Sequence, residues 1–297
     1  MSHSHSHNHP HAHQSPSNLR TAFLLNLGFT ILEIFGGLYT NSLAILSDAV
    51  HDFGDSLSLG MAWYFESLAK NDPDHKFSYG YRRFSLLSAL LNALILFGGS
   101  IYMLSQAVRR ILNPEPSQAE GMILFAVIGI LVNGAAALKL KNENSINARV
   151  VALHLLEDVL GWAAVLVVGI ILLFSDSPYL DPILSMLIAL YIVYNVLKNL
   201  RQTVKIFLQG VPAGLSLEDI QDRVLPVENV ESIHHPHVWS LDGERHVLTM
   251  HVVVPEDTTL DQARCVKNDI KEALSSLDIS HLTIEIEYGE SDCTMAG

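Results

Sequence analysis

The sequence predicts an α-helical membrane protein, with six transmembrane helices followed by a small soluble α/β domain. Charged residues make up only 16% of the 297 residues, whereas about 25% is usual for soluble domains, and the mean hydropathy is +0.28. Residues 1–210 hold 14 acidic and 13 basic side chains, whereas residues 211–297 hold 17 and 5. The net charge of −13 therefore belongs almost entirely to the C-terminal part, which indicates two domains in two solvents.

Six stretches are apolar over roughly the 20 residues that a helix needs to cross a bilayer. They are Leu19–Tyr39, Leu43–Leu68, Phe84–Leu112, Gly121–Leu138, Val150–Phe174 and Leu180–Leu200. The N-terminal residues are polar and histidine-rich, unlike a cleavable signal peptide. We therefore expect a disordered tail over residues 1–17, a membrane domain over 18–209, a soluble domain over 210–290 and a flexible tail over 291–297.

The basic residues between these stretches predict the orientation in the membrane. One set of helix ends carries eleven, and the opposite set carries only Arg109 and Arg110. The eleven are Arg20, Lys70, Lys76, Arg82, Arg83, Lys139, Lys141, Arg149, Lys198, Arg201 and Lys205. Because cytoplasmic loops carry the excess of Lys and Arg, both termini and the acidic domain are expected in the cytoplasm.

Composition also excludes several classes of protein. The chain has no basic surface of the kind that nucleic acid requires. Its two cysteines, Cys265 and Cys293, are too few for a four-cysteine zinc site or a disulfide framework.

Ionisable residues inside two of the apolar stretches predict a metal site. An ionisable side chain at the centre of a spanning helix costs on the order of 3 kcal/mol and therefore indicates a function. The second stretch contains His51-x-x-x-Asp55 and the fifth contains His154-x-x-x-Asp158. Residues four apart share one face of a helix, so each helix can present one imidazole and one carboxylate. Two such helices side by side would supply four ligands that suit tetrahedral zinc.

Other interpretations of these residues are structural or concern protons. The four side chains can hydrogen-bond between helices or line a water-filled proton path. Asp48 lies on the same face as His51 and Asp55 and is a candidate for that proton path. Further polar side chains are expected to make interhelical hydrogen bonds: Asn26, Glu33, Asn92 and Asn133. A membrane metalloenzyme is disfavoured, because no His-Glu-x-x-His motif is present and four protein ligands leave no position for water.

Five motifs in this order resemble the cation diffusion facilitator family, in its zinc- and cadmium-exporting, bacterial-type branch. They begin at Ser42 (SLAILSDAVHxxxD), Phe77 (FSYGYRR), Arg109 (RRILNPEP), His154 (HxxxDxxG) and Ile233 (IHxxHVWS). The resemblance spans residues 18–288. It implies six transmembrane helices, a cytosolic ferredoxin-like domain of order αββαβ, and a homodimer in a lipid bilayer, here the bacterial inner membrane.

By the same resemblance, the protein is a secondary transporter rather than an enzyme, and exchanges zinc or cadmium for protons by alternating access. Its transport site falls on His51, Asp55, His154 and Asp158. Zinc would be both the transported substrate and a regulatory ligand of the cytosolic domain. Two alternatives remain open at this point: export of cobalt, iron or nickel, and metal sensing without flux.

One family motif is incomplete in this chain. Some bacterial relatives carry Asp-x-x-His-x-x-x-His in the loop between the second and third helices and bind a second metal there. Here Asp72 and His75 match, but Tyr79 stands at the last position. The N-terminal tail carries six alternating histidines, from His3 to His13. We interpret them as a native segment that collects metal loosely, rather than as a purification tag, whose histidines are usually contiguous.

The C-terminal domain is expected to alternate helices and strands. Helices are predicted over Leu217–Val224 and Leu260–Leu277, and strands over Val230–Trp239, His246–Val254 and His281–Glu287. Four residues are candidates for a second metal site: His234, His251, His281 and Glu287. The alternative is a solvated sheet face. Strict alternation places His237 on the face opposite His234, unless a bulge intervenes.

Overall fold

A computed structural model describes residues 16–69, 73–81, 83–141, 146–175 and 177–289 of the chain. The predicted C-terminal tail, residues 291–297, lies outside the described residues, and so does the N-terminal tail with its six histidines, apart from Pro16 and Ser17. The chain divides into two compact units. One comprises residues 1–70 and 88–199, and the other comprises residues 71–87 and 200–297.

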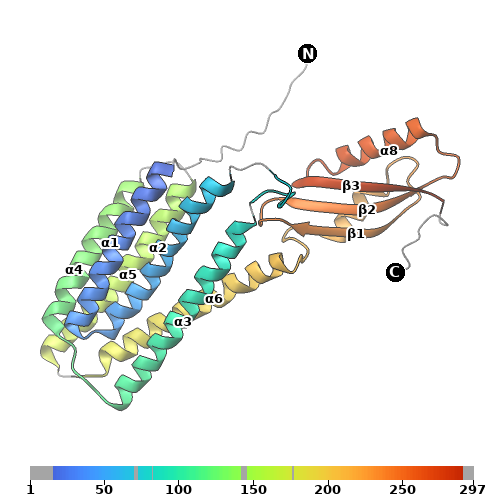
Figure 1. Ribbon diagram of the computed structural model, residues 1–297. Coiled ribbons are helices and arrows are strands. Elements are labelled where there is room, and N and C mark those ends of the chain that lie inside the picture. The colour runs from blue at the N-terminus through green and yellow to red at the C-terminus, as the bar shows by residue number, and fades with distance from the viewer. Residues whose placement is uncertain (1–15, 70–72, 82, 142–145, 176, 290–297) are drawn as a thin grey trace. The chain divides into compact units, whose positions relative to one another are not determined.

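All six predicted helices are present (Figure 1), each within four residues of its expected bounds except at the end of the sixth, which continues seven residues beyond the predicted Leu200. They are α1 (Pro16–Thr40), α2 (Leu43–Ala69), α3 (Phe84–Leu112), α4 (Ala119–Lys141), α5 (Ile146–Phe174) and α6 (Leu180–Phe207). Within the described residues, five of them are long and apolar enough to cross a membrane. The exception is α2, because Asp48, Asp52 and Asp55 interrupt its apolar sequence.

Helices α1, α2, α4 and α5 pack together, with the largest interfaces between α4 and α5 and between α1 and α2 (Figure 1). Trp162 of α5 is the largest fully buried side chain at this packing. Its indole ring occupies the space beside Gly129 of α4, where a Cβ would lie 2.3 Å from the ring. The absence of a side chain at residue 129 therefore allows α4 and α5 to approach closely.

A tight turn joins α1 to α2 at Asn41. Its φ of 53° lies in the left-handed region, which Asn tolerates better than most residues. Arg110 at the end of α3 donates to the Asn41 carbonyl at 2.8 Å and to the Asn41 side chain at 2.9 Å. The turn is thus fixed to α3 by a bidentate contact.

The C-terminal unit has the predicted αββαβ order. Its elements are α7 (Leu217–Val224), β1 (Ser232–Ser240), β2 (His246–Val254), α8 (Leu260–Ala273) and β3 (Ile279–Tyr288). The sheet order is β1-β2-β3, with β1 antiparallel and β3 parallel to β2. Helix α8 begins with a capping box between Thr259 and Gln262. It ends at Ala273, four residues before the predicted end at Leu277. Just beyond this end, the Ser275 hydroxyl donates to the Glu272 carbonyl.

One face of the sheet forms the core of this unit. Leu248, Met250 and Val252 of β2 are buried against apolar residues of both helices, such as Ile220 of α7 and Ile270 of α8. Alternation then directs Thr249, His251 and Val253 to the opposite face. The histidines of interest therefore lie on the face away from the helices.

The buried face of β2 yields a stability prediction. We expect Leu248→Ala to lower the free energy of unfolding of a fragment comprising residues 210–297 by about 2–5 kcal/mol, because the side chain is fully buried. The matched control is Leu260→Ala, where the side chain is 67% exposed and the expected change is below about 0.5 kcal/mol. Urea unfolding measures both values, and equal losses would contradict this assignment of faces.

Candidate functional site

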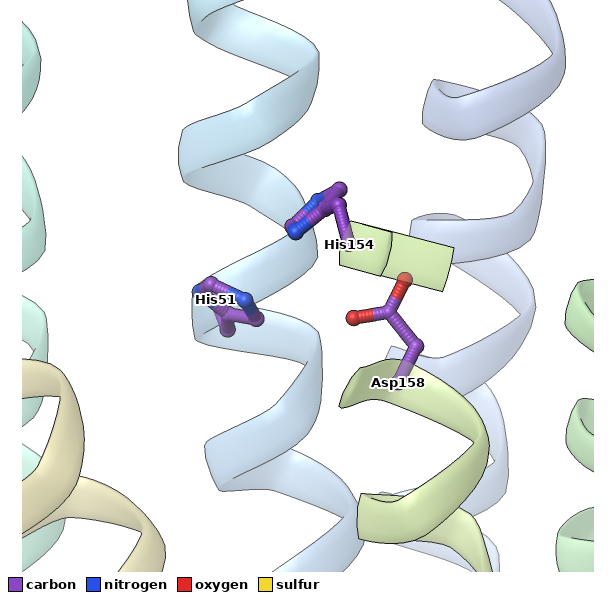
Figure 2. Close-up of side chains that lie close together, drawn as sticks. All are labelled: His51, His154 and Asp158. Atoms are coloured by element: carbon purple, nitrogen blue, oxygen red, sulfur yellow. The ribbon is translucent and has the colours of Figure 1, made fainter. Parts of the chain in front are cut away.

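The four polar residues predicted on the second and fifth helices meet in one place. His51 and Asp55 lie one turn apart on α2, and His154 and Asp158 lie one turn apart on α5. Figure 2 shows His51, His154 and Asp158 directed toward one another. One ligand atom of each lies within 4.8 Å of those of the other two. Asp55 completes the group, with its Oδ2 2.9 Å from His154 Nε2 and 3.7 Å from His51 Nε2.

These distances suit a small tetrahedral ion. With metal–ligand bonds of about 2.0–2.2 Å, neighbouring ligand atoms are separated by about 3.4 Å. The two distances from Asp55 Oδ2 bracket this value. His51, Asp55 and His154 are partly exposed and Asp158 is buried. The group is therefore largely enclosed by protein but still accessible to a small ion. Two imidazole nitrogens and two carboxylates can therefore surround one ion after small adjustments.

More acidic residues surround this group. Asp48 and Asp52 of α2 are 7% and 5% exposed, and Glu33 of α1 is fully buried. The Asp48 carboxylate lies beside Gly161 of α5, at ordinary contact distance from a Cβ built there. Glu33 faces Asp52 across the contact between α1 and α2. Several carboxyl groups are thus held within reach of the four candidate ligands.

Two of the predicted interhelical hydrogen bonds are present. Asn26 of α1 donates to the Asp52 carbonyl at 3.1 Å and to the Ser56 hydroxyl at 2.9 Å. Asn92 of α3 donates to the Ser58 hydroxyl at 2.7 Å. All three bonds connect a neighbouring helix to α2, the helix that carries His51 and Asp55.

A second group of potential ligands lies on the sheet of the C-terminal unit. One oxygen of Glu287 on β3 lies 2.7 Å from Nε2 of His234 on β1, and its other oxygen lies 2.6 Å from Nδ1 of His251 on β2. The ligand atoms of these three residues lie within 4.8 Å of one another. Glu285 also approaches, 3.5 Å from Nε2 of His251. Three of the four predicted residues are thus adjacent.

The fourth predicted residue, His281, does not join this group. The parallel register sets His281 opposite Val247 of β2, whereas Glu285 is opposite His251. Four residues of strand span about 13 Å, so His281 is too far along β3 to share an ion with His251. Its ring instead lies 5.3 Å from that of Tyr79.

A β-bulge in β1 determines on which face of the sheet the histidines of this strand lie. Between His234 and His237 the register shifts by one residue against β2, so that His237 pairs with Thr249 and His234 with His251. The bulge brings His237, which is exposed, to the same face as His234. It also brings His235, whose φ is 48°, within 5.4 Å of the His251 ring and 5.3 Å of the His234 ring. His235 was not among the predicted residues, although two successive histidines before Pro236 indicate it in the sequence.

The loop before α3 is organised by an aspartate that was not predicted. Asp74 accepts from the Tyr81 hydroxyl and from the backbone amides of Phe77 and Lys76. These donors, Tyr81 first, lower the pKa of the Asp74 carboxyl below its ordinary value of 3.8. His75 is exposed, and Asp72 lies outside the described residues. Within the described part of this loop, His75 belongs to no group of metal ligands.

Comparison with known proteins decides the family. Residues 19–208 match the cation efflux transmembrane domain, and residues 212–288 match the cytoplasmic domain of cation efflux proteins. The chain belongs to the cation efflux family. Cation efflux proteins are multi-pass membrane transporters and not enzymes, and their C-terminal domain is cytoplasmic.

Curated relatives of this cation efflux protein are similar over most of their length. The "Cadmium, cobalt and zinc/H(+)-K(+) antiporter" of Bacillus subtilis is 32% identical, over 91% of this chain and 88% of that protein. The "Metal cation efflux system protein CzcD" of Cupriavidus metallidurans is 33% identical, over 91% and 86%. The "Zinc transporter ZitB" of Escherichia coli is 32% identical, over 97% and 92%.

A solved structure matches the C-terminal part alone. It is described as the metal-bound C-terminal domain of the CzcD transporter, is 32% identical, and covers 25% of this chain and 99% of that one, with a TM-score of 0.22.

Proposed function

We propose that this protein exports divalent metal ions, chiefly zinc, from the cytoplasm in exchange for protons. The observation that carries the proposal is the convergence of His51, Asp55, His154 and Asp158 between α2 and α5. Membership of the cation efflux family and the zinc-, cadmium- and cobalt-transporting names of its relatives support it. A metal sensor without flux would need the same ligands, so flux itself is the decisive measurement.

The ligand set favours zinc or cadmium over harder ions. Imidazole nitrogen suits zinc, copper, iron and nickel, whereas sites made only of oxygen suit magnesium, calcium and manganese. Two histidines and two aspartates in tetrahedral reach match the ordinary coordination of zinc. Export of cobalt, iron or nickel is the alternative, because affinity alone does not separate these metals from zinc.

We further propose that all six helices span the membrane, with both termini in the cytoplasm. The acidic residues that set α2 apart are buried or partly buried among its neighbours, so they do not prevent it from spanning. The eleven basic residues at one set of helix ends support the orientation. The functional unit is proposed to be a homodimer, which the family of the C-terminal domain supports.

Proton exchange follows from the chemistry of the ligands. Zinc binds neutral imidazole and ionised carboxylate, so protons and metal compete for the same four side chains. Open to the cytoplasm at about pH 7, the site takes up zinc. Open to a more acidic exterior, the histidines take up protons and release the zinc. One occupant thus replaces the other at each side of the membrane, and Asp48 is a candidate to pass protons to the site.

The cytosolic domain is proposed to bind zinc as a regulatory ligand through His234, His251 and Glu287. The two histidines come from β1 and β2 and the carboxylate from β3, so a bound ion would join all three strands. His235 and Glu285 lie close enough to contribute after small movements of their side chains. Zinc there would stabilise the sheet face of this domain only when cytoplasmic zinc is abundant.

Loss of one transport ligand should abolish flux. In proteoliposomes with a pH gradient, we expect zinc uptake by the Asp158→Ala protein to fall to the level of protein-free vesicles, because zinc loses one of four ligands. The control is Glu157→Ala, which removes the same charge from the adjacent, exposed position of α5 and should retain uptake within about twofold. Full uptake by Asp158→Ala would refute the proposed site, and zinc binding without uptake by the parent would favour a sensor.

Coupling to protons can be measured in the same vesicles. With an acidic lumen, zinc uptake should alkalinise the lumen, as a trapped pH dye would report, since each ion displaces protons from the site. Collapsing the gradient with a protonophore should slow zinc accumulation by at least about tenfold. Equal zinc accumulation with and without the pH gradient would exclude proton exchange. Another ion would then have to drive transport.

The cytosolic site yields a separate binding prediction. In the fragment of residues 210–297, Glu287→Gln should weaken zinc binding by at least about tenfold, because the carboxylate lies between both histidines. Glu244→Gln, which removes a charge from the exposed turn between β1 and β2, should leave the affinity unchanged. Titration calorimetry measures both, and equal affinities in the two variants would exclude Glu287 as a ligand.

A further inference from the structure

A carboxylate of α6 caps the beginning of α2. Asp181 is 2% exposed and lies in the first turn of α6. One oxygen, Oδ2, accepts from the backbone amide of Leu43 at 2.7 Å. The other, Oδ1, accepts from the Ser42 hydroxyl at 2.5 Å and from the amide of Ala44 at 3.2 Å. All three donors belong to the start of α2.

These bonds complete a capping arrangement that α2 does not make by itself. The first four amides of a helix have no acceptor within it. In α2, Ser42 serves two of them, through its hydroxyl to Ile45 and its carbonyl to Leu46. Asp181 serves the other two from a different helix. A negatively charged group is also favoured at this position by the dipole of α2 and by that of α6, which begins at the neighbouring residue.

The connection between the two helices continues for one more turn. Ser47 of α2 and Ser185 of α6 share a hydrogen bond of 2.7 Å, and both are fully buried. Beyond them, Ala189 of α6 lies in an apolar cluster with Leu43 of α2 and Met103 of α3. The polar side-chain contacts between α2 and α6 that join described residues therefore lie in the first two turns of both helices.

The hydrogen bonds from the start of α2 to Asp181 involve the helix that carries two of the four candidate transport ligands. Leu43 precedes His51 by two turns and Asp55 by three, or about 12 Å and 18 Å along a rigid helix. A change in the direction or rotation of α2 at its start therefore moves both side chains.

We propose that Asp181 is a positioning residue for transport, which ties the start of α2 to α6 so that the two helices move together between the two states of the site. This inference rests on the proposed function. Asp181 would not touch the metal. Its role would be to fix where His51 and Asp55 are held relative to α5, and to carry movement of α6 into α2.

The first test separates movement from binding. In Asp181→Asn, the amide group that replaces one oxygen opposes a backbone donor, so we expect the maximal rate of zinc uptake to fall by at least about tenfold. The dissociation constant for zinc at the transport site, measured in detergent, should change by less than about threefold. Unchanged uptake would overturn the inference, and so would a loss of binding equal to the loss of rate.

A second variant distinguishes a tie between helices from a simple helix cap. Ser42→Asp combined with Asp181→Ala places a carboxylate at the N-cap of α2 itself and removes every bond that Asp181 makes to α2, while the Ser47–Ser185 bond remains. We expect the helix start to be restored and uptake to remain low. Recovery of uptake in this double variant would show that capping alone is required and would overturn the inference.

A third measurement does not depend on flux. Hydrogen exchange of the Leu43 and Ala44 amides should quicken by at least about tenfold in Asp181→Asn, and return toward the parent rate in the double variant. If the parent binds zinc without carrying it, the proposed function fails, while the exchange rates still report whether Asp181 holds the start of α2. Equal exchange in the parent and in Asp181→Asn would overturn the inference by itself.

Discussion

An ionisable side chain among apolar helices needs a partner, and this requirement governs the arrangement of the membrane unit. His51, Asp55, His154 and Asp158 satisfy it by facing one another, since the alternative is a charge exposed to hydrocarbon. α2 and α5 must therefore lie with these faces together. The surrounding contacts serve that alignment: Asn26 and Asn92 hydrogen-bond to α2 from α1 and α3, and Asp181 holds its first turn.

The need of each ionisable side chain for a partner also explains why these four residues suit an ion that binds reversibly. Asp55 contacts both His51 and His154, and Asp158 lies within 4.8 Å of the two histidines. The contact between Asp55 and His154 at 2.9 Å is one that a metal or a proton can replace. In the proposed cycle, the protein changes one set of partners for another without ever leaving a charge unpaired.

How far the sequence predicts the structure depends on how rigid each element is. A helix repeats so regularly that His51-x-x-x-Asp55 and His154-x-x-x-Asp158 each predict a shared face, and the structure brings the two faces together. Strands follow their alternation less strictly. The bulge in β1 moved His235 and His237, and the register of β3 left His281 apart, because both depend on pairing between distant segments. Asp181 was likewise not singled out, since its partners lie more than 130 residues away.

The fit of Trp162 against Gly129 limits how the sequence can vary. Trp162 lies one turn beyond Asp158 on α5, and its ring fills the space that a side chain at residue 129 of α4 would occupy. A larger residue at 129 would therefore require a smaller side chain at 162. In related chains the two positions should covary. α4 contributes none of the four candidate ligands. Its sequence is nevertheless constrained by the site, because α4 packs against the helix that carries His154 and Asp158.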